Sequence, residues 1–217
     1  MKVFKFGGAS VKDAEGVRNV LKVLTNNRDS SLLIVISAMG KMTNALEDVV
    51  GSYLKNGNFQ EHLQLVKEYH HTILIDLFGN NEHPIFQEVR TYFTELENFL
   101  KHNKSQQYDF VYDQVVIYGE LLSTKIVSEY LHSQGMKNAL LDARSCIKTD
   151  SSFRDDPVQW DQTQEQIVCG IASDEYNDFI TIEGSNTDHT YKIVVLVDPL
   201  AGGINISEIF CVRIIFY

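Results

Sequence analysis

Two adjacent glycines near the start of the chain stand where a predicted strand gives way to a predicted helix. Gly7 and Gly8 follow Lys5 on the strand side, and Ser10 comes just before a segment with apolar residues at helical spacing, 11–24. A junction of this kind aims backbone N–H groups and the positive end of a helix at one point. With a lysine and a serine beside it, the junction suits the binding of a phosphate group, although an ordinary tight turn explains the same residues.

A second loop of small residues follows the next predicted strand. Residues 32–36 read L-L-I-V-I, and such a continuous apolar run is typical of a strand buried on both faces of a parallel sheet. Residues 2–36 therefore predict a βαβ unit with a right-handed crossover. The loop at 37–44 then leads into a helical pattern at 45–50. Because ligands bind at the carboxyl edge of open parallel sheets, we expect the two loops to lie together there.

The overall composition limits the class of protein. The chain has 217 residues, of which 44% are apolar and 22% charged, and this fits one large or two small globular domains. The net charge is −10. This acidic balance argues against a nucleic-acid surface and against an anionic membrane surface as the partner.

The cysteines and the start of the chain indicate the compartment. Cys146, Cys169 and Cys211 are far apart and form no C-x-x-C pair, so they argue against a disulfide framework or a zinc site and predict a reducing environment. Lysines interrupt the first residues, unlike a signal peptide, and the sequence contains no run of about 18 apolar residues. We therefore expect a cytoplasmic protein.

A long block at 45–105 predicts helices. Apolar residues recur there at three- and four-residue steps in three segments, 47–54, 59–78 and 84–100. The pair His70 and His71 could suggest a metal site. Adjacent positions on a helix point about 100° apart, however, and cannot chelate one ion well. We therefore expect both histidines to be ordinary surface or boundary side chains.

The sequences of both loops resemble those of aspartate kinases, which belong to the amino-acid kinase family. Residues 5–11 read K-F-G-G-A-S-V and are similar to the family's K-F-G-G-T-S-V, with Ala9 in place of the usual threonine. Residues 35–44 read V-I-S-A-M-G-K-M-T-N and resemble V-V-S-A-x-G-x-x-T-N. Residues 119–123 read G-E-L-L-S and match a G-E-x-x-S element at a helix start. The block at 45–105 resembles the long insertion that covers the aspartate side of the family's cleft.

The resemblance implies an α/β fold, a three-layer sandwich with a mostly parallel central sheet (the amino-acid kinase fold), truncated and with a helical insertion. It assigns residues 1–167 to the N-terminal part of the catalytic domain. Beyond that point the family's G-R-x-G-S-D element is not found, so we interpret residues 168–217 as a divergent or damaged tail that forms strands. The regulatory ACT domains of the family are not found in the 217 residues either.

The function implied by the resemblance is the ATP-dependent phosphorylation of the L-aspartate β-carboxylate to 4-phospho-L-aspartate, the first step of lysine, threonine and methionine biosynthesis. Its ligands would be L-aspartate, ATP and Mg²⁺, and assembly into a homo-oligomer is compatible with it. Lys5 would be the catalytic lysine, and Glu120 would hold the α-ammonium group of aspartate. Taken without the resemblance, Glu120 is better explained as a glutamate stabilised by a helix N-terminus.

The resemblance also assigns the remaining binding residues. Thr43 and Asn44 would face the substrate. The phosphates of ATP would contact Lys5, Gly7, Gly8, Ser10, Ser37, Ala38 and Gly40.

Later segments carry weaker signals. Residues 137–144 predict a short strand that ends in a D-x-R sequence, and with residues 147–156 they resemble the family's D-x-R … T-D stretch along the substrate cleft. Asp142 and Asp150 would otherwise be a strand-end cap and a turn aspartate. Residues 158–167 predict one more helix.

Two other functions remain open. A glutamate or acetylglutamate kinase would share the fold, but the long helical insertion and the wording of residues 5–11 argue against it. A catalytically inactive fragment that binds ligand weakly, or that only pairs with other subunits, is favoured by the missing arginine–aspartate element. The apolar run at 209–217 adds an expected aggregation-prone edge strand.

Overall fold

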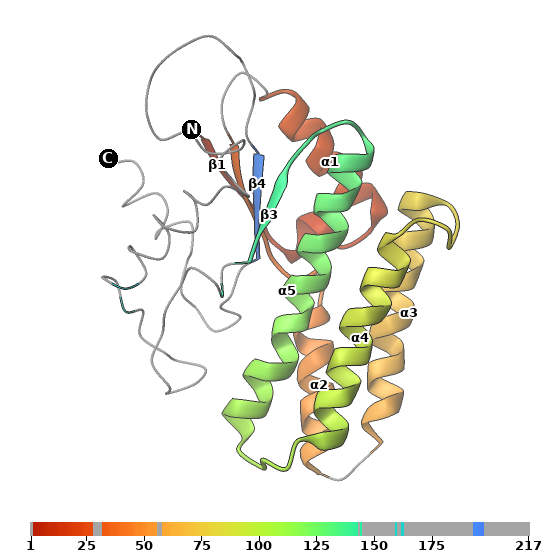
Figure 1. Cartoon of the computed structure of the whole chain (residues 1–217), viewed down its shortest axis with the longest axis vertical. Coiled ribbons are helices and arrows are strands. Elements are labelled where there is room, and N and C mark those ends of the chain that lie inside the picture. Colours follow the sequence, from red (N-terminus) through yellow and green to blue (C-terminus); the bar gives the residue numbers. More distant parts are fainter. Residues whose placement is uncertain are drawn as a thin grey trace.

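Within the described residues a small parallel sheet packs against the helices. The computed structural model describes residues 2–27, 32–55, 58–142, 144, 159, 162 and 193–197. Within them four parallel strands pair in the order β1-β2-β4-β3 (Figure 1). The strands are β1 Lys2–Phe6, β2 Leu32–Ile36, β3 Ala139–Leu141 and β4 Ile193–Val197.

The strand pairing confirms the parallel arrangement of β1 and β2. Lys2 lies opposite Leu32 and Phe6 opposite Ile36, and every residue of β2 is buried. The sequence predicts strands in the tail, but not the central position that β4 takes between β2 and β3. A strand from far along the chain therefore joins β2 and β3 into one sheet.

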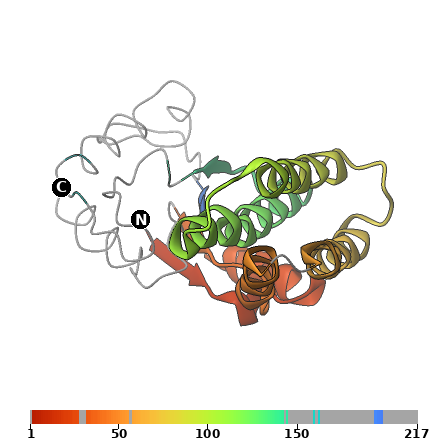
Figure 2. The same cartoon turned by 90° about the horizontal axis from the view of Figure 1, so that it is seen from below.

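The described helices all lie on one side of this sheet, and α2 to α5 run side by side as a bundle (Figures 1 and 2). The short 3₁₀ helix η1 (Gly8–Val11) precedes α1. The bounds of the longer helices are α1 Ala14–Thr25, α2 Met42–Leu54, α3 Phe59–Phe78, α4 Ile85–His102 and α5 Tyr108–Ser133. The described part of the chain is thus mostly helical, and the helices predicted in the block at 45–105 are confirmed.

Two predicted helix starts are wrong. Val11 belongs to η1, and α1 begins only after Asp13, whose Oδ1 accepts the Gly16 N–H at 2.8 Å as an N-terminal cap. Gly119 lies in the middle of α5 rather than at a helix start. A glycine inside a helix costs about 1 kcal/mol relative to alanine. Here it permits close packing, because a Cβ at Gly119 would lie 3.0 Å from the Cβ of Ala38.

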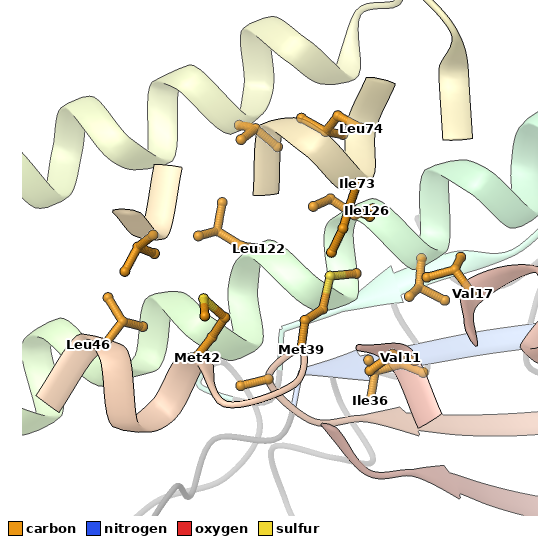
Figure 3. Packing of buried hydrophobic residues seen from close by; sticks show 14 of the residues in the cluster. Val11, Val17, Ile36, Met39, Met42, Leu46, Ile73, Leu74, Leu122 and Ile126 are labelled. Atoms are coloured by element: carbon orange, nitrogen blue, oxygen red, sulfur yellow. The ribbon is translucent and has the colours of Figure 1, made fainter. Parts of the chain in front are cut away.

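The core joins the sheet to the helices through the second loop. Met39, at the carboxyl end of β2, is fully buried, and Figure 3 shows it pointing toward Ile73 of α3 and Ile126 of α5. Met42 lies beside it and faces Leu122. The loop at 37–41 is therefore anchored in the hydrophobic core through Ala38 and Met39.

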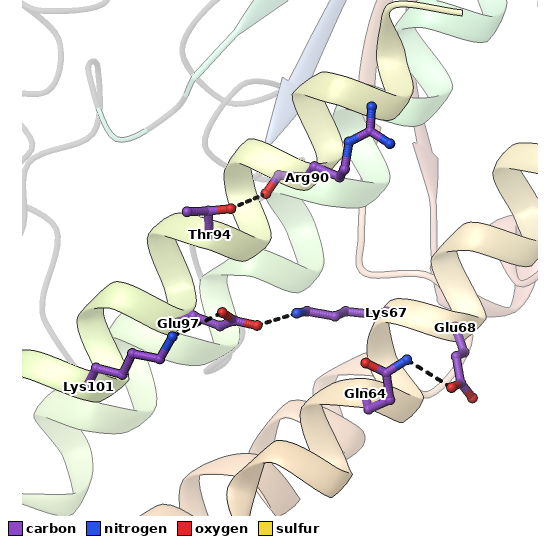
Figure 4. A network of polar contacts seen from close by, with 7 residues as sticks. All are labelled: Gln64, Lys67, Glu68, Arg90, Thr94, Glu97 and Lys101. Carbon is purple, nitrogen blue, oxygen red and sulfur yellow. Dashed lines mark hydrogen bonds and ion pairs between the residues drawn. The ribbon is translucent and has the colours of Figure 1, made fainter. Parts of the chain in front are cut away.

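The outer side of the bundle carries an ion-pair network. Glu97 of α4 binds Lys67 of α3 and lies 3.4 Å from Lys101 of its own helix (Figure 4). The hydrogen bond from Lys67 is the main cause that lowers the pKa of the Glu97 carboxyl. The network links α3 to α4 across the surface of the bundle.

His70 corrects the expectation for the histidine pair. His71 is exposed, but His70 is fully buried, with its ring packed edge-on against Tyr69 and Phe93. Its Nδ1–H donates to the Val66 carbonyl at 2.8 Å, one turn earlier in α3. The reason is helical spacing, since position 70 falls on the same buried stripe of α3 as residues 66 and 73.

Several expectations concern residues that are not described. Asp150, most of the helix predicted at 158–167, the apolar run at 209–217 and the three cysteines lie outside the described residues. Within the described residues, no helix combines the length and the apolar character of a membrane span. The same residues contain no group of three or more His, Cys, Asp or Glu side chains that could hold a metal ion.

Burial makes His70 a source of acid sensitivity. Desolvation lowers the pKa of His70 from 6.5 to about 4, so the neutral ring is favoured in the folded state. Protonation favours the unfolded chain, and the stability contributed by the neutral ring is present above pH 6.5 and lost as the pH falls toward 4. We expect this loss to approach about 3 kcal/mol in the free energy of unfolding.

The measurement is urea denaturation between pH 7 and pH 4 of the wild type, His70→Gln and the exposed control His71→Gln. The wild type and His71→Gln should lose stability together as the pH falls, whereas His70→Gln should lose less. Parallel curves for all three proteins would show that His70 does not titrate in this way.

Candidate phosphate-binding site

The first loop is built by β1 and η1. Gly7 continues the extended chain after β1, with φ −74° and ψ 168°, and η1 follows at once. The Ser10 N–H donates to the Gly7 carbonyl at 2.8 Å. The first N–H groups of a helix have no carbonyl partner inside that helix, so Gly8 and Ala9 present donors at the start of η1. The donors belong to this short turn and not to the N-terminus of α1, which Asp13 caps.

The second loop is fastened directly to the first. The Gly40 N–H donates to the Gly8 carbonyl at 2.9 Å, and the Ser37 N–H donates to the Phe6 carbonyl at 3.1 Å. A Cβ at Gly8 would lie 2.6 Å from the Ala38 carbonyl oxygen and 2.7 Å from that of Gly40. Only glycine permits this approach, so the structure brings the two predicted loops together at the carboxyl edge of β1 and β2.

α5 brings a third element to the same place. Besides Gly119, which packs on Ala38, the Ser123 Oγ donates to the Ser37 carbonyl at 2.8 Å. Glu120 lies between these two residues in the sequence and is 2% exposed. The G-E-L-L-S element therefore holds the second loop through Gly119 and Ser123, one helical turn apart. Its buried glutamate corrects the alternative of a helix N-terminal residue, because position 120 is mid-helix.

The remaining predicted residues surround these loops. Lys5 is exposed and lies in β1 opposite Val35, two residues before Gly7. Thr43 is half-buried and Asn44 exposed, and both lie in the first turn of α2. The loops thus receive a cation from β1 and polar side chains from α2.

Asp142 and Arg144 are paired with each other beyond the end of β3. The Arg144 backbone N–H donates to Asp142 Oδ1 at 2.9 Å, and the Arg144 Nε lies 3.0 Å and 2.9 Å from the two carboxylate oxygens. This hydrogen bond is also the main cause that raises the pKa of Arg144. The geometry matches the strand-end cap considered for Asp142.

One residue of this region is not among those that the sequence indicates. Tyr69 of α3 is half-buried, and its hydroxyl donates to the Lys12 carbonyl at the end of η1. Burial, and then the charge of Asp13, raise the pKa of this phenol above its ordinary value. Nothing in the local pattern distinguishes Tyr69 from other residues at the edge of a helical stripe.

Comparison with known proteins agrees with these features. The model of the amino acid kinase family matches residues 1–179. The chain belongs to the amino acid kinase family. Aspartokinase 1, chloroplastic, of Arabidopsis thaliana is 36% identical over 147 residues, which are 65% of this chain and 25% of that protein. The aspartokinase of Chlamydia pneumoniae is 30% identical over 152 residues, 70% of this chain and 32% of the relative.

Solved structures show the same family fold. Escherichia coli aspartokinase III in complex with lysine and aspartate matches with a TM-score of 0.73 and 20% identity, over 90% of this chain and 40% of the other. The same enzyme in complex with aspartate and ADP matches with a TM-score of 0.72. The chain described here spans about a quarter to a third of the length of the two aspartokinases named above.

The two glycines of the first loop should respond differently to alanine. Gly8→Ala places a methyl group against two backbone oxygens and should lower the free energy of unfolding by about 2–3 kcal/mol. Gly7→Ala should change it by less than about 1 kcal/mol. At Gly7 φ is −74°, and no atom of the described residues lies within 4 Å of a Cβ. Urea denaturation of both variants measures the difference, and equal effects would contradict the close loop contact.

Proposed function

We propose that this chain carries the phosphate-binding half of an aspartate kinase site, which transfers the γ-phosphoryl group of ATP to the β-carboxylate of L-aspartate. This reaction yields 4-phospho-L-aspartate and begins lysine, threonine and methionine biosynthesis. The observation that carries the proposal is the joining of both loops to the G-E-L-L-S element of α5, by the Gly40–Gly8 hydrogen bond and the Ser123–Ser37 hydrogen bond. The named relatives, which are aspartokinases, support the choice of substrate.

The donor set of the first loop fits a phosphate group. The N–H groups at the start of η1 are oriented donors, and the space over Gly7 is open to a ligand among the described residues. Ser10 is exposed beside them and can add a hydroxyl donor. Lys5 supplies the positive charge that a phosphoryl group needs during transfer.

In this proposal the second loop mainly shapes the site, and fewer of its residues contact phosphate than the resemblance implies. The Gly40 N–H is committed to Gly8, so Gly40 shapes the rim of the site and does not donate to phosphate. Ser37 accepts from Ser123 through its carbonyl, which leaves its own hydroxyl for the ligand. Ala38 is buried against Gly119 and keeps the rim close to α5.

The aspartate side would be formed by α2 and α5. Glu120 would hold the α-ammonium group of the substrate, and Thr43 and Asn44 would face it from the first turn of α2. The reaction needs no covalent intermediate with the protein, because positioning and charge stabilisation suffice for phosphoryl transfer. Mg²⁺ would accompany ATP and offset the charge of its phosphates.

The fold proposed for the complete catalytic domain is the three-layer sandwich of the family. The described helices supply the layer on one side of the sheet (Figure 2). We propose that the helical bundle of α2 to α5 corresponds to the insertion that covers the aspartate side of the cleft.

Removal of the Lys5 charge tests the proposed mechanism. Lys5→Ala should lower aspartate-dependent ADP release at least about 100-fold, because the transferred phosphoryl group loses its neutralising cation. The thermal transition should stay unchanged, since Lys5 is exposed on β1. A coupled assay of ADP release with ATP, Mg²⁺ and L-aspartate measures the rate.

Lys2→Ala is the matched control, because Lys2 lies at the other end of the same strand and its Nζ donates to Asn27 Oδ1 at 3.1 Å. It should retain the wild-type rate. Turnover by Lys5→Ala close to that of the wild type would refute the role of Lys5. A wild-type protein without aspartate-dependent ADP release, but with bound ligand, would support the inactive ligand-binding alternative instead.

The Glu120 carboxylate can be tested by binding alone. Glu120→Gln keeps the volume of this buried side chain and removes its charge, so the Kd for L-aspartate should rise at least about tenfold. The Kd for ATP–Mg²⁺ should stay the same, because the phosphate loops are untouched. Isothermal calorimetry with each ligand measures both constants, and an equal loss for both ligands would speak against a specific contact with the substrate ammonium.

A further inference from the structure

Tyr69 of α3 reaches both loops of the proposed site. Its hydroxyl donates to the carbonyl of Lys12, the residue that follows η1. The same oxygen lies 2.6 Å from the position of a Cβ at Gly40, where φ is +56°. One phenol therefore touches the end of the first loop and the turn of the second.

These contacts close a ring of bonded and packed groups. η1 begins at Gly8 and is followed directly by Lys12. Gly40 is hydrogen-bonded to Gly8, and the Cβ of Lys12 lies 3.6 Å from the Cβ position at Gly40. The Tyr69 hydroxyl lies beside both Lys12 and Gly40. Without this hydroxyl, the hydrogen bond from the Gly40 N–H to the Gly8 carbonyl would be the direct link between the two loops among the contacts described here.

The helix that carries Tyr69 is itself held firmly. Val66, His70 and Ile73 of α3 are buried in the bundle, and Lys67 on its outer side binds Glu97 of α4 (Figure 4). The guanidinium of Arg18 in α1 donates to the carbonyl of Asp76 in α3, which ties α3 to the βαβ unit a second time. The helix that positions the phenol is thus held by contacts outside the two loops.

We propose that Tyr69 is a positioning residue, which holds the η1 loop and the Gly40 turn at the spacing that phosphate binding needs. The proposal rests on the proposed function, since it names the group that fixes the geometry of the same site. It also gives the helical bundle a part at the phosphate side of the site, in addition to the aspartate side.

The first test measures the loops without any ligand. Tyr69→Phe removes the hydroxyl, and the Gly40 amide should exchange its hydrogen about fivefold faster, which corresponds to the loss of about 1 kcal/mol from one hydrogen bond. Tyr53→Phe is the matched control, because the Tyr53 hydroxyl donates to the Asn103 carbonyl at 2.8 Å outside both loops. It should leave exchange at Gly40 unchanged. Equal exchange rates at Gly40 in the wild type and Tyr69→Phe would overturn the proposal.

The second test measures nucleotide binding by calorimetry with ATP–Mg²⁺. Tyr69→Phe should weaken binding about fivefold and leave the Kd for L-aspartate unchanged, a selectivity that general loss of folding would not produce. If the wild type binds ATP–Mg²⁺ and Tyr69→Phe binds it equally well, only the role of Tyr69 fails. If the wild type does not bind ATP–Mg²⁺, the proposed function fails and the role of Tyr69 at a phosphate site fails with it.

A double-mutant cycle tests the steric contact between Tyr69 and Gly40. Gly40→Ala brings a methyl group against the hydroxyl oxygen, whereas in Tyr69→Phe the nearest ring atom, Cζ, would lie 3.5 Å away, an ordinary contact distance. The double variant should therefore be less destabilised than the sum of the two single variants. Additive losses of stability in urea denaturation would show that the phenol does not press on this turn.

Discussion

The backbone contact between Gly8 and Gly40 is the constraint on which the site depends. Two loops that follow neighbouring parallel strands must come within hydrogen-bond distance, and any side chain at position 8 would meet carbonyl oxygens. The contact converts two separate turns into one rim with a fixed spacing. It also uses one of the N–H groups that a phosphate could have bound, so that the remaining donors gather at the start of η1.

The helices support the two joined loops through contacts with the second loop. α5 passes from the far end of the bundle to the sheet as one continuous helix, and its Gly119 and Ser123 contact the second loop at Ala38 and Ser37. Met39 anchors the same loop in the hydrophobic core. A rim supported on several sides keeps its donors oriented before a ligand arrives, which is the condition for electrostatic stabilisation without reorganisation.

Family membership and the proposed reaction are supported by different comparisons. The amino acid kinase model covers residues 1–179, whereas the stretches shared with the two named aspartokinases are only 25% and 32% of those proteins. β4 shows that residues beyond 179 also join the sheet, between β2 and β3. The tail therefore contributes at least one strand to the fold, although its sequence does not resemble the expected element.

The sequence by itself determined the helices α2 to α4, the parallel pair β1 and β2, and the meeting of two small-residue loops, because periodicity and glycine position are local signals. Only the tertiary structure decided that α5 runs through Gly119, that His70 is buried and that Tyr69 reaches the loops. Those three outcomes depend on which faces of distant segments meet. A local sequence pattern does not specify the segment against which a helix will pack. The same reason explains β4, whose place in the sheet is set by strands more than fifty residues before it.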